Sequence, residues 1–238
     1  MQNSPFLLIC IMRKFPVTIF DNFYENPDLV RDYALSLNYR SSADGKWPGV
    51  RTNEIADLNP RFFKMFVDKI LSLFFDLEYT IIDWEVETHF QKINPFSENE
   101  FDIKNAGWIH KDLDSLVSGV IYLNPNPEPN WGTSIYKLKP NEEYFGAQTT
   151  KLLHYSNSNE FDEEEHEMQK KYSNGKYIET IRVENIYNRL ILFEGNEFHG
   201  VPSYYSDGDP RLTQVFFITK LNSSSQFPVL RSKLIGIE

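Results

Sequence analysis

Residues 108–123 read WIHKDLDSLVSGVIYL, which places an H-x-D motif directly before the apolar run Leu116–Leu123. A short apolar run with several branched side chains is typical of a buried strand. From Thr80 onward the chain repeats this pattern of short apolar or alternating runs, which are separated by polar turn clusters such as Asn124-Pro125-Asn126-Pro127. Many short strands with such turns predict a mainly β sandwich or jelly roll.

The strands that these runs predict are Ile81–Ile93, Leu116–Leu123, Thr133–Leu138, Tyr177–Val183, Arg189–Phe193, Phe198–Val201 and Leu212–Thr219. One segment among them differs, because residues 160–175 pass from acidic to basic side chains and end at Gly175. The Glu-to-Lys spacing there supports helicity. We interpret this segment as an exposed helix inserted between strands, with a solvated face.

The part of the chain before Thr80 predicts helices, apart from an alternating strand at Phe15–Phe20. Asn26-Pro27 and Asn59-Pro60 each predict a helix start, since Asn caps helices well and Pro suits the first turn. Between the two helices, Ser41–Thr52 (SSADGKWPGVRT) is expected to be a loop because Gly and Pro set its turns.

The whole chain, residues 1–238, is expected to form one domain. It would consist of a flexible extension (1–11), a helical preface (12–79) and a β core (80–220) with the helical insert at 160–175. Phe6–Met12 is apolar but short, and no basic residue precedes it, so we interpret it as an extension or an outer strand rather than a signal peptide. Met12 is a plausible alternative start to Met1.

Composition and charge limit the classes of function. Hydrophobic residues make up 41% of the chain and aromatic residues 15%, as in folded domains. The formal net charge of −10 disfavours nucleic acid as a partner, because like charges repel. The single cysteine, Cys10, cannot form an internal disulfide, which favours a reducing, cytoplasmic location. No apolar run approaches the roughly 20 residues that span a bilayer, so we expect no membrane partner.

The H-x-D motif predicts two ligands to one metal ion. On an extended segment, residues two apart project to the same side, so His110 and Asp112 can reach the same ion. His199, on a later predicted strand, is the candidate for the third ligand. Two histidines and one carboxylate on a single face leave three coordination positions open, which suits ferrous iron binding a co-substrate and dioxygen.

The last predicted strand carries a candidate anion site. Arg211 and Thr213 share one face of that strand by alternation. A buried arginine is unfavourable unless an anion pairs with it, and its planar fork matches a carboxylate. A dicarboxylate co-substrate would chelate iron through its 2-oxo acid end and place its far carboxylate on Arg211 and Thr213.

The order H-x-D, distal His and Arg-x-Thr resembles the 2-oxoglutarate/iron(II)-dependent dioxygenase superfamily, especially its prolyl-hydroxylase-like branch. The resemblance covers roughly residues 90–217 and includes Gly119–Asn124 (GVIYLN), Trp131-Gly132-Thr133 and Phe193–Val201 (FEGNEFHGV). It implies a double-stranded β-helix (a cupin-like jelly roll) with flanking helices and the metal in its open mouth. Many relatives carry two glycines where this chain has Gly132-Thr133, a departure that bears on strand packing.

The resemblance also implies residue roles and a reaction. His110, Asp112 and His199 match the catalytic iron ligands, Arg211 and Thr213 match the 2-oxoglutarate anchor, and Tyr122 matches a tyrosine that often contacts this co-substrate. The implied activity is hydroxylation of a substrate C–H bond, which uses O2 and releases succinate and CO2. The presence of Asp112 argues against a halogenase, whose ligand set lacks that carboxylate.

Other interpretations of the same residues stay open. A cupin-like metal protein that never uses 2-oxoglutarate has similar ligands, and only the Arg211-x-Thr213 strand argues against it. A non-catalytic jelly-roll binding module with a vestigial site would bind no metal. Arg211 is also able to form an ion pair with Asp207 or Asp209, and Tyr122 is also interpretable as a core aromatic residue.

The sequence does not choose the substrate. A peptidyl side chain and a small molecule fit a mouth of this kind equally well, and function is decided by the site rather than by the fold. Three residues either line this mouth or pack at the surface: Trp108, Lys111 and Trp131. The remaining histidines are interpreted as ordinary surface or core residues: His89, His154 and His166.

Overall fold

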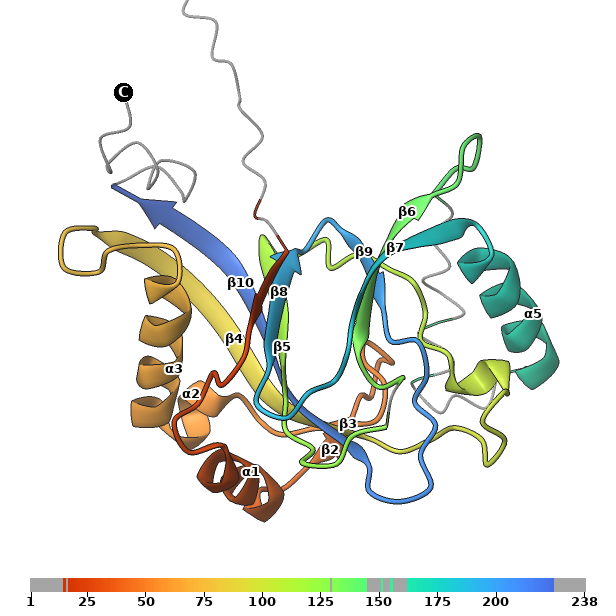
Figure 1. Ribbon diagram of the computed structural model, residues 1–238, viewed down its shortest axis with the longest axis horizontal. Helices are drawn as coiled ribbons and strands as arrows, with labels where there is room; N and C mark the ends of the chain where they lie inside the picture. Colours follow the sequence, from red (N-terminus) through yellow and green to blue (C-terminus); the bar gives the residue numbers. More distant parts are fainter. Residues whose placement is uncertain are drawn as a thin grey trace, which may run out of the picture.

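Two antiparallel sheets face each other in the computed structural model, with helices outside them (Figure 1). The structure describes residues 15, 17–128, 130–144, 151, 155 and 162–224. The predicted extension at residues 1–11 and His154 lie outside the described residues. None of the helices that are described combines the length and apolar character that a membrane span requires.

The large sheet has seven strands in the order β1-β8-β5-β10-β4-β3-β2. Their bounds are β1 Thr18–Phe20, β2 Arg40–Ser41, β3 Val50–Arg51, β4 Ile82–Ile93, β5 Val117–Tyr122, β8 Leu190–Glu194 and β10 Arg211–Ser223. The small sheet has the order β7-β6-β9, formed by β6 Thr133–Leu138, β7 Tyr177–Val183 and β9 Phe198–Gly200. An isolated bridge between His110 and His199 adds the H-x-D segment beside β9.

The path of the chain between these sheets identifies the fold. After β5 in the large sheet, the chain enters the small sheet for β6 and β7, returns for β8, crosses again for β9 and ends in the large sheet with β10. Such alternation of antiparallel strands between two facing sheets is a double-stranded β-helix, so the predicted mainly β fold class is confirmed. The seven predicted core strands are also confirmed, with ends that differ by a few residues.

The region predicted as a loop between the first two helices is only partly a loop. Residues 40–41 and 50–51 pair as β2 and β3, and β3 also pairs with β4 at the edge of the large sheet. The prediction of a loop over Ser41–Thr52 was therefore wrong near both ends, at Ser41 in β2 and at Val50–Arg51 in β3. The Gly and Pro residues do set turns, but the residues after them gain ladder hydrogen bonds from β4, which local sequence does not reveal.

The N-terminal helices cover the outer face of the large sheet (Figure 1). They are α1 Pro27–Ser36, α2 Ile55–Leu58 and α3 Pro60–Ser72. Asn26 and Asn59 cap α1 and α3 through side-chain oxygens that accept from Leu29 N (3.3 Å) and Phe62 N (3.0 Å), which confirms both predicted helix starts. Aromatic rings fill the space between α3 and the sheet, as in the edge-to-face pair of Phe66 and Phe216.

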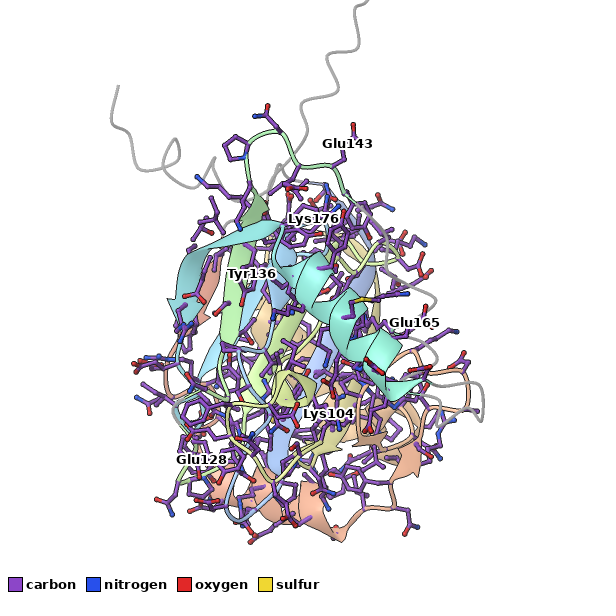
Figure 2. The ribbon with its side chains drawn as sticks, turned by 90° about the vertical axis from the view of Figure 1, so that its right-hand side faces the viewer. Lys104, Glu128, Tyr136, Glu143, Glu165 and Lys176 are labelled. Carbon is purple, nitrogen blue, oxygen red and sulfur yellow. The ribbon has the colours of Figure 1, made fainter. Side chains whose placement is uncertain are left out.

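The inserted helix is present as α5, Glu163–Asn174, but its predicted solvated character was wrong on one face. Asp162 caps it by accepting from Glu165 N at 3.0 Å. Figure 2 shows α5 on the outside of the molecule, with Glu165 at its outer edge. The opposite face of the helix is buried through His166, Lys170 and Ser173. The charge pattern did not predict that this face is buried, because a lysine and a histidine make up most of it.

Candidate active site

The three predicted metal ligands meet at one point. Asp112 contributes one oxygen 3.5 Å from His110 Nε2 and the other 3.4 Å from His199 Nε2. One candidate ligand atom from each of the three residues lies within 4.8 Å of the others. Ligands about 2.0–2.2 Å from a shared ion lie roughly 3 Å or a little more from one another, so this cluster has the spacing of a metal site.

The backbone sets the orientation of both imidazole rings. His110 Nδ1 lies 2.8 Å from the Trp108 carbonyl oxygen, and His199 Nδ1 lies 2.9 Å from the Glu197 carbonyl oxygen. A carbonyl can only accept, so each Nδ1 donates its N–H to the carbonyl and Nε2 is the nitrogen that faces Asp112. Fixing the ring and its tautomer through the second nitrogen is how proteins prepare histidines to bind metal.

Electrostatics keep this cluster in its metal-binding protonation state. Burial, together with the charges of Lys151 and His199, lowers the pKa of His110 to about 4. Burial alone would raise the pKa of Asp112, but His199 and His110 outweigh it and hold the pKa well below its usual value. Metal ligands have to be neutral imidazoles and ionised carboxylates, and both requirements are met for these two residues at neutral pH.

Strand pairing and one tight turn place the H-x-D segment. His110 and His199 exchange two backbone hydrogen bonds, of 3.0 and 2.9 Å. Asp112 N donates to Gly195 O at 2.7 Å. A Cβ at Gly195 would lie 2.2 Å from Ser115 O and 2.6 Å from Asp112 O, so only glycine allows the β8–β9 turn to approach this loop so closely.

The triad opens onto a cavity of about 770 Å³ between the two sheets, and Arg211 also lines it. Only 3% of Arg211 is exposed. Its Nε donates to Trp131 O at 2.7 Å, whereas its buried Nη2 has no hydrogen-bond partner among the described residues. Burial lowers the pKa of Arg211, and Tyr122 and Tyr204 oppose this effect. The described residues include both Asp207 and Asp209, and neither forms an ion pair with Arg211.

Thr213 and Tyr122 lie next to Arg211 on the inner face of the large sheet. They pair with each other across β10 and β5. The Thr213 hydroxyl is buried and has no partner within the described part of the chain. Tyr122 donates its hydroxyl to Thr133 Oγ1 at 2.8 Å, and its ring centroid lies 5.6 Å from the Arg211 guanidinium carbon. Thr133 lines the cavity and was not predicted.

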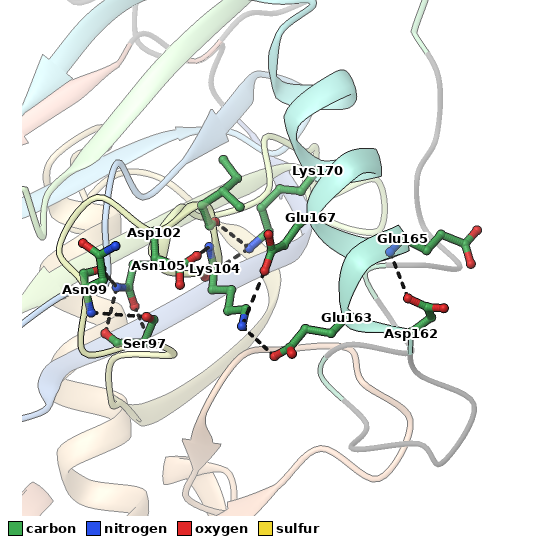
Figure 3. Close-up of polar contacts among 11 residues, drawn as sticks. Ser97, Asn99, Asp102, Lys104, Asn105, Asp162, Glu163, Glu165, Glu167 and Lys170 are labelled. Carbon is green, nitrogen blue, oxygen red and sulfur yellow. Dashed lines mark hydrogen bonds and ion pairs between the residues drawn. The ribbon is translucent and has the colours of Figure 1, made fainter.

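Helix α5 holds the backbone that leads to His110, and Figure 3 shows Lys170 pointing from α5 toward Lys104 in that segment. Lys170 Nζ donates to the carbonyl oxygens of Ile103, Lys104 and Ala106 at 3.3, 3.1 and 2.8 Å. Burial lowers the pKa of Lys170 to about 7, whereas Asp102 and Glu167 favour its ammonium form. The three carbonyl acceptors also favour that form, because only an ammonium group has three N–H donors.

One turn further along α5, Asn174 adds two bonds closer to the metal site. Its Nδ2 donates to Gly107 O at 2.8 Å, and its Oδ1 accepts from Ile109 N at 3.0 Å. His166, on the same face, packs edge-on against Trp108 with ring centroids 5.4 Å apart. We refer to His166, Lys170 and Asn174 together as the α5 clasp. It explains the burial of His166, which the sequence placed among ordinary residues.

Several further residues line the cavity. Trp108 and Lys111, both weighed as mouth residues, line it, whereas Trp131 is buried and donates its Nε1 to Tyr205 O at 2.7 Å. Arg51 and Lys151 also line it and had no sequence signal: one follows a Gly/Pro-rich stretch, and the other is a single lysine far from any motif.

Comparison with protein families gives a match at residues 8–202 to the model described as "Family of unknown function (DUF6445)". No curated protein matches the chain. Several solved structures are similar in shape. HygX from Streptomyces hygroscopicus, with nickel and 2-oxoglutarate bound, has 12% identity and a TM-score of 0.49, covering 84% of this chain and 82% of that chain.

Two prolyl hydroxylases are also similar. The Pseudomonas putida prolyl-4-hydroxylase has 15% identity and a TM-score of 0.44, covering 85% of this chain and 91% of that chain. The Trichoplax adhaerens prolyl hydroxylase, in complex with a hypoxia inducible factor peptide fragment, has 14% identity and a TM-score of 0.49, covering 85% and 82%. At these identities and TM-scores, the fold assignment rests on the strand order of this chain itself.

Proposed function

This chain belongs to DUF6445, a family of unknown function, and from its site we propose that it is an iron(II)- and 2-oxoglutarate-dependent oxygenase. One observation carries the proposal. The same cavity has a cluster of two imidazoles and a carboxylate on its wall and, elsewhere on that wall, a buried guanidinium with an unpaired N–H group. A dicarboxylate that chelates a metal ion would satisfy both.

The residues fit iron(II). His110, Asp112 and His199 supply two nitrogen ligands and one oxygen ligand, and both Nε2 atoms face the carboxylate. This facial set of two histidines and one carboxylate is characteristic of non-haem iron(II) oxygenases, because it leaves positions for a co-substrate and O2. We therefore assign these three residues as the catalytic metal ligands.

The residues also fit 2-oxoglutarate. Arg211 Nη2 and Thr213 Oγ1 are buried polar atoms without partners in the described chain, and leaving such atoms unpaired costs about 1–3 kcal/mol each. The far carboxylate of 2-oxoglutarate would accept from both. Tyr122 would contribute through its ring beside Arg211, since its hydroxyl already donates to Thr133. This unsatisfied pair favours the oxygenase over a cupin-like protein that does not use 2-oxoglutarate.

When bound, iron(II) and 2-oxoglutarate supply the chemistry that couples O2 to oxidation of a substrate C–H bond, with release of succinate and CO2. The chain's contribution is to bring the three ligands together, with neutral His110 and ionised Asp112, and to anchor the co-substrate at its far end. We propose hydroxylation as the reaction. The substrate would be a small molecule or a peptidyl side chain, and the location would be cytoplasmic.

A metal-binding experiment tests the ligand assignment. Anaerobic titration of the metal-free protein with iron(II), followed by calorimetry, should show one bound ion, and His199→Ala should abolish this binding because two remaining ligands do not hold the ion. Iron and 2-oxoglutarate together should give slow succinate formation without added substrate. Iron binding that survives in His199→Ala would contradict the assignment.

A second variant separates the co-substrate anchor from the metal site. Arg211→Ala should weaken 2-oxoglutarate binding to the metal-loaded protein by roughly 10- to 100-fold, the range for a lost hydrogen-bonded charge, with little change in iron affinity. Arg61→Ala, on the exposed face of α3, is the matched control. Equal loss of iron and 2-oxoglutarate in Arg211→Ala would count against the anchoring role.

A further inference from the structure

A second arginine enters the same cavity from the edge of the large sheet. Arg51 on β3 pairs with Gln91 on β4, and Gln91 pairs with Thr213 on β10. Directly paired residues in an antiparallel sheet project to the same face. Arg51 therefore belongs to the same inner face as Thr213, two strands away, and it lines the cavity.

Aromatic rings hold the Arg51 guanidinium. Its central carbon lies 4.9 Å from the Trp47 ring centroid and 5.4 Å from that of Phe217. Its Nε is buried and has no hydrogen-bond partner in the described part of the chain, and no described carboxylate lies within ion-pair distance of it. A guanidinium carries its N–H groups along the edge of a planar fork that suits an oxyanion, and the buried Nε–H on this edge of Arg51 is unused.

The two guanidinium groups contact different parts of β10 (Arg211–Ser223). Phe217, which contacts Arg51, lies near the middle of β10, six residues after Arg211. Phe217 pairs with Ser118, which pairs with Phe193, and the Phe193 ring lies 4.5 Å from the His199 ring. Arg51 is thus held on the metal side of the cavity, whereas Arg211 is held beside Trp131 and Tyr122.

The charge of the cavity wall differs in sign from that of the whole chain. The chain carries −10, but five cations line the cavity against three carboxylates: Lys46, Arg51, Lys111, Lys151 and Arg211 against Glu87, Asp112 and Asp114. Lys46 pairs with Asp44, and Lys111 bonds to Asn196. Lys151 is 8% exposed and, among the described carboxylates, has no ion-pair partner.

We propose that the substrate of this oxygenase carries an oxyanion, a carboxylate or a phosphate ester, which the free edge of Arg51 binds while Lys151 adds positive charge. This inference rests on the proposed function, because it places the anion beside the metal ligands. It narrows the substrate class, since neutral peptide side chains and neutral metabolites would leave the Arg51 edge unpaired. A cavity of about 770 Å³ lies within the range for small-molecule sites.

Three aromatic probes of similar size test the charge requirement: benzoate, phenyl phosphate and neutral benzamide. Saturation-transfer NMR on the metal-free full-length protein measures their binding. We expect benzoate or phenyl phosphate to bind at least about tenfold more tightly than benzamide, as for one charged hydrogen-bonded pair, and the tighter anion identifies the class of oxyanion. Equal binding of benzamide would overturn the proposal.

Variants assign the binding to Arg51. Arg51→Gln should remove the preference for the anions, Arg51→Lys should keep part of it because it retains charge but not the planar fork, and Arg61→Gln on the surface of α3 should keep all of it. Circular dichroism verifies that each variant is folded. Unchanged anion binding in Arg51→Gln would overturn the proposal, as would a loss of 2-oxoglutarate affinity as large as the loss of anion affinity.

A paramagnetic measurement distinguishes this proposal from the function on which it rests. With manganese(II) and 2-oxoglutarate present, the protons of the bound anion should relax faster, because the probe lies near the metal. If manganese binds but leaves these protons unaffected, the substrate subsite is refuted while the oxygenase proposal stands. If manganese does not bind, yet Arg51→Gln still abolishes anion binding, the oxygenase proposal fails and the anion site is supported.

Discussion

Two sets of helices flank the β-helix, and they are attached by different kinds of interaction. Helix α3 and its neighbours pack aromatic and aliphatic side chains on the outer face of the large sheet. Helix α5 instead presents His166, Lys170 and Asn174 to the segment that leads to His110. The first set is attached by burial of apolar surface, and the second mainly by directional hydrogen bonds.

The difference shows how stability and positioning are divided within one fold. Apolar burial is non-directional and roughly proportional to area, so the α3 side stabilises the sheet without fixing any one atom of the site. The α5 clasp bonds to five backbone groups between Ile103 and Ile109. Bonds of this kind fix positions, as the outer partners of metal ligands do. The exposed ion pairs of Lys104 with Glu163 and Glu167 at the edge of the clasp contribute little by comparison.

The largest expected effect on stability comes from the apolar side. Phe66→Ala removes a fully buried ring that contacts Phe23 and Phe216, and it should destabilise the protein by about 4 kcal/mol. Thermal unfolding should then occur roughly 10 °C lower, while the metal affinity of the folded protein stays unchanged. The control is Met65→Ala, at an exposed neighbouring position. A weaker metal affinity in Phe66→Ala would contradict the inference that the α3 side stabilises the sheet without positioning the metal ligands.

A smaller loss of stability, but a loss of metal affinity, is expected from the clasp. Lys170→Met should destabilise the protein by roughly 2–3 kcal/mol, because three carbonyls lose a charged donor. It should also weaken metal binding by roughly tenfold, since the segment before His110 is released. Urea unfolding and metal titration measure the two effects. Lys171→Met, at the exposed next position, should change neither quantity; if both variants behave alike, the clasp does not position His110.

The smallest expected effect is a dependence on pH. Burial, together with the charges of Lys170 and Lys104, lowers the pKa of His166 from its ordinary value of 6.5 to about 3. The unfolded chain therefore takes up the proton first, so the free energy of unfolding falls as pH drops below 6.5. Between pH 7 and pH 5 this loss is roughly 2 kcal/mol.

Urea unfolding of the metal-free protein and of His166→Gln, at both pH values, measures this term. The variant should lack that part of the pH dependence, because glutamine does not titrate. Identical pH profiles for the two proteins would show that His166 is not held neutral against Trp108. The clasp would then consist of the hydrogen bonds of Lys170 and Asn174 alone.

Local sequence was sufficient where the physical cause is local. The helix starts follow from Asn26 and Asn59, whose side chains cap the backbone N–H group three residues later. The core strands follow from apolar runs that are bounded by turns. His110 and Asp112 project to the same side because they are two residues apart on an extended segment. Arg51 was missed because its strand exists only through pairing with β4, and Lys170 because its acceptors lie more than sixty residues earlier.

The succession of strands along the chain, the class of fold and the chemical types of the candidate metal ligands all follow from the amino-acid sequence. Each of these depends on residues that are neighbours in the chain or on motif order along it. Only the tertiary structure decided that the two histidines face one carboxylate, that Arg211 lies in the same cavity, and that Arg51 enters it from the sheet edge. These facts depend on register between distant strands, and a shift of one residue would turn each side chain to the opposite face.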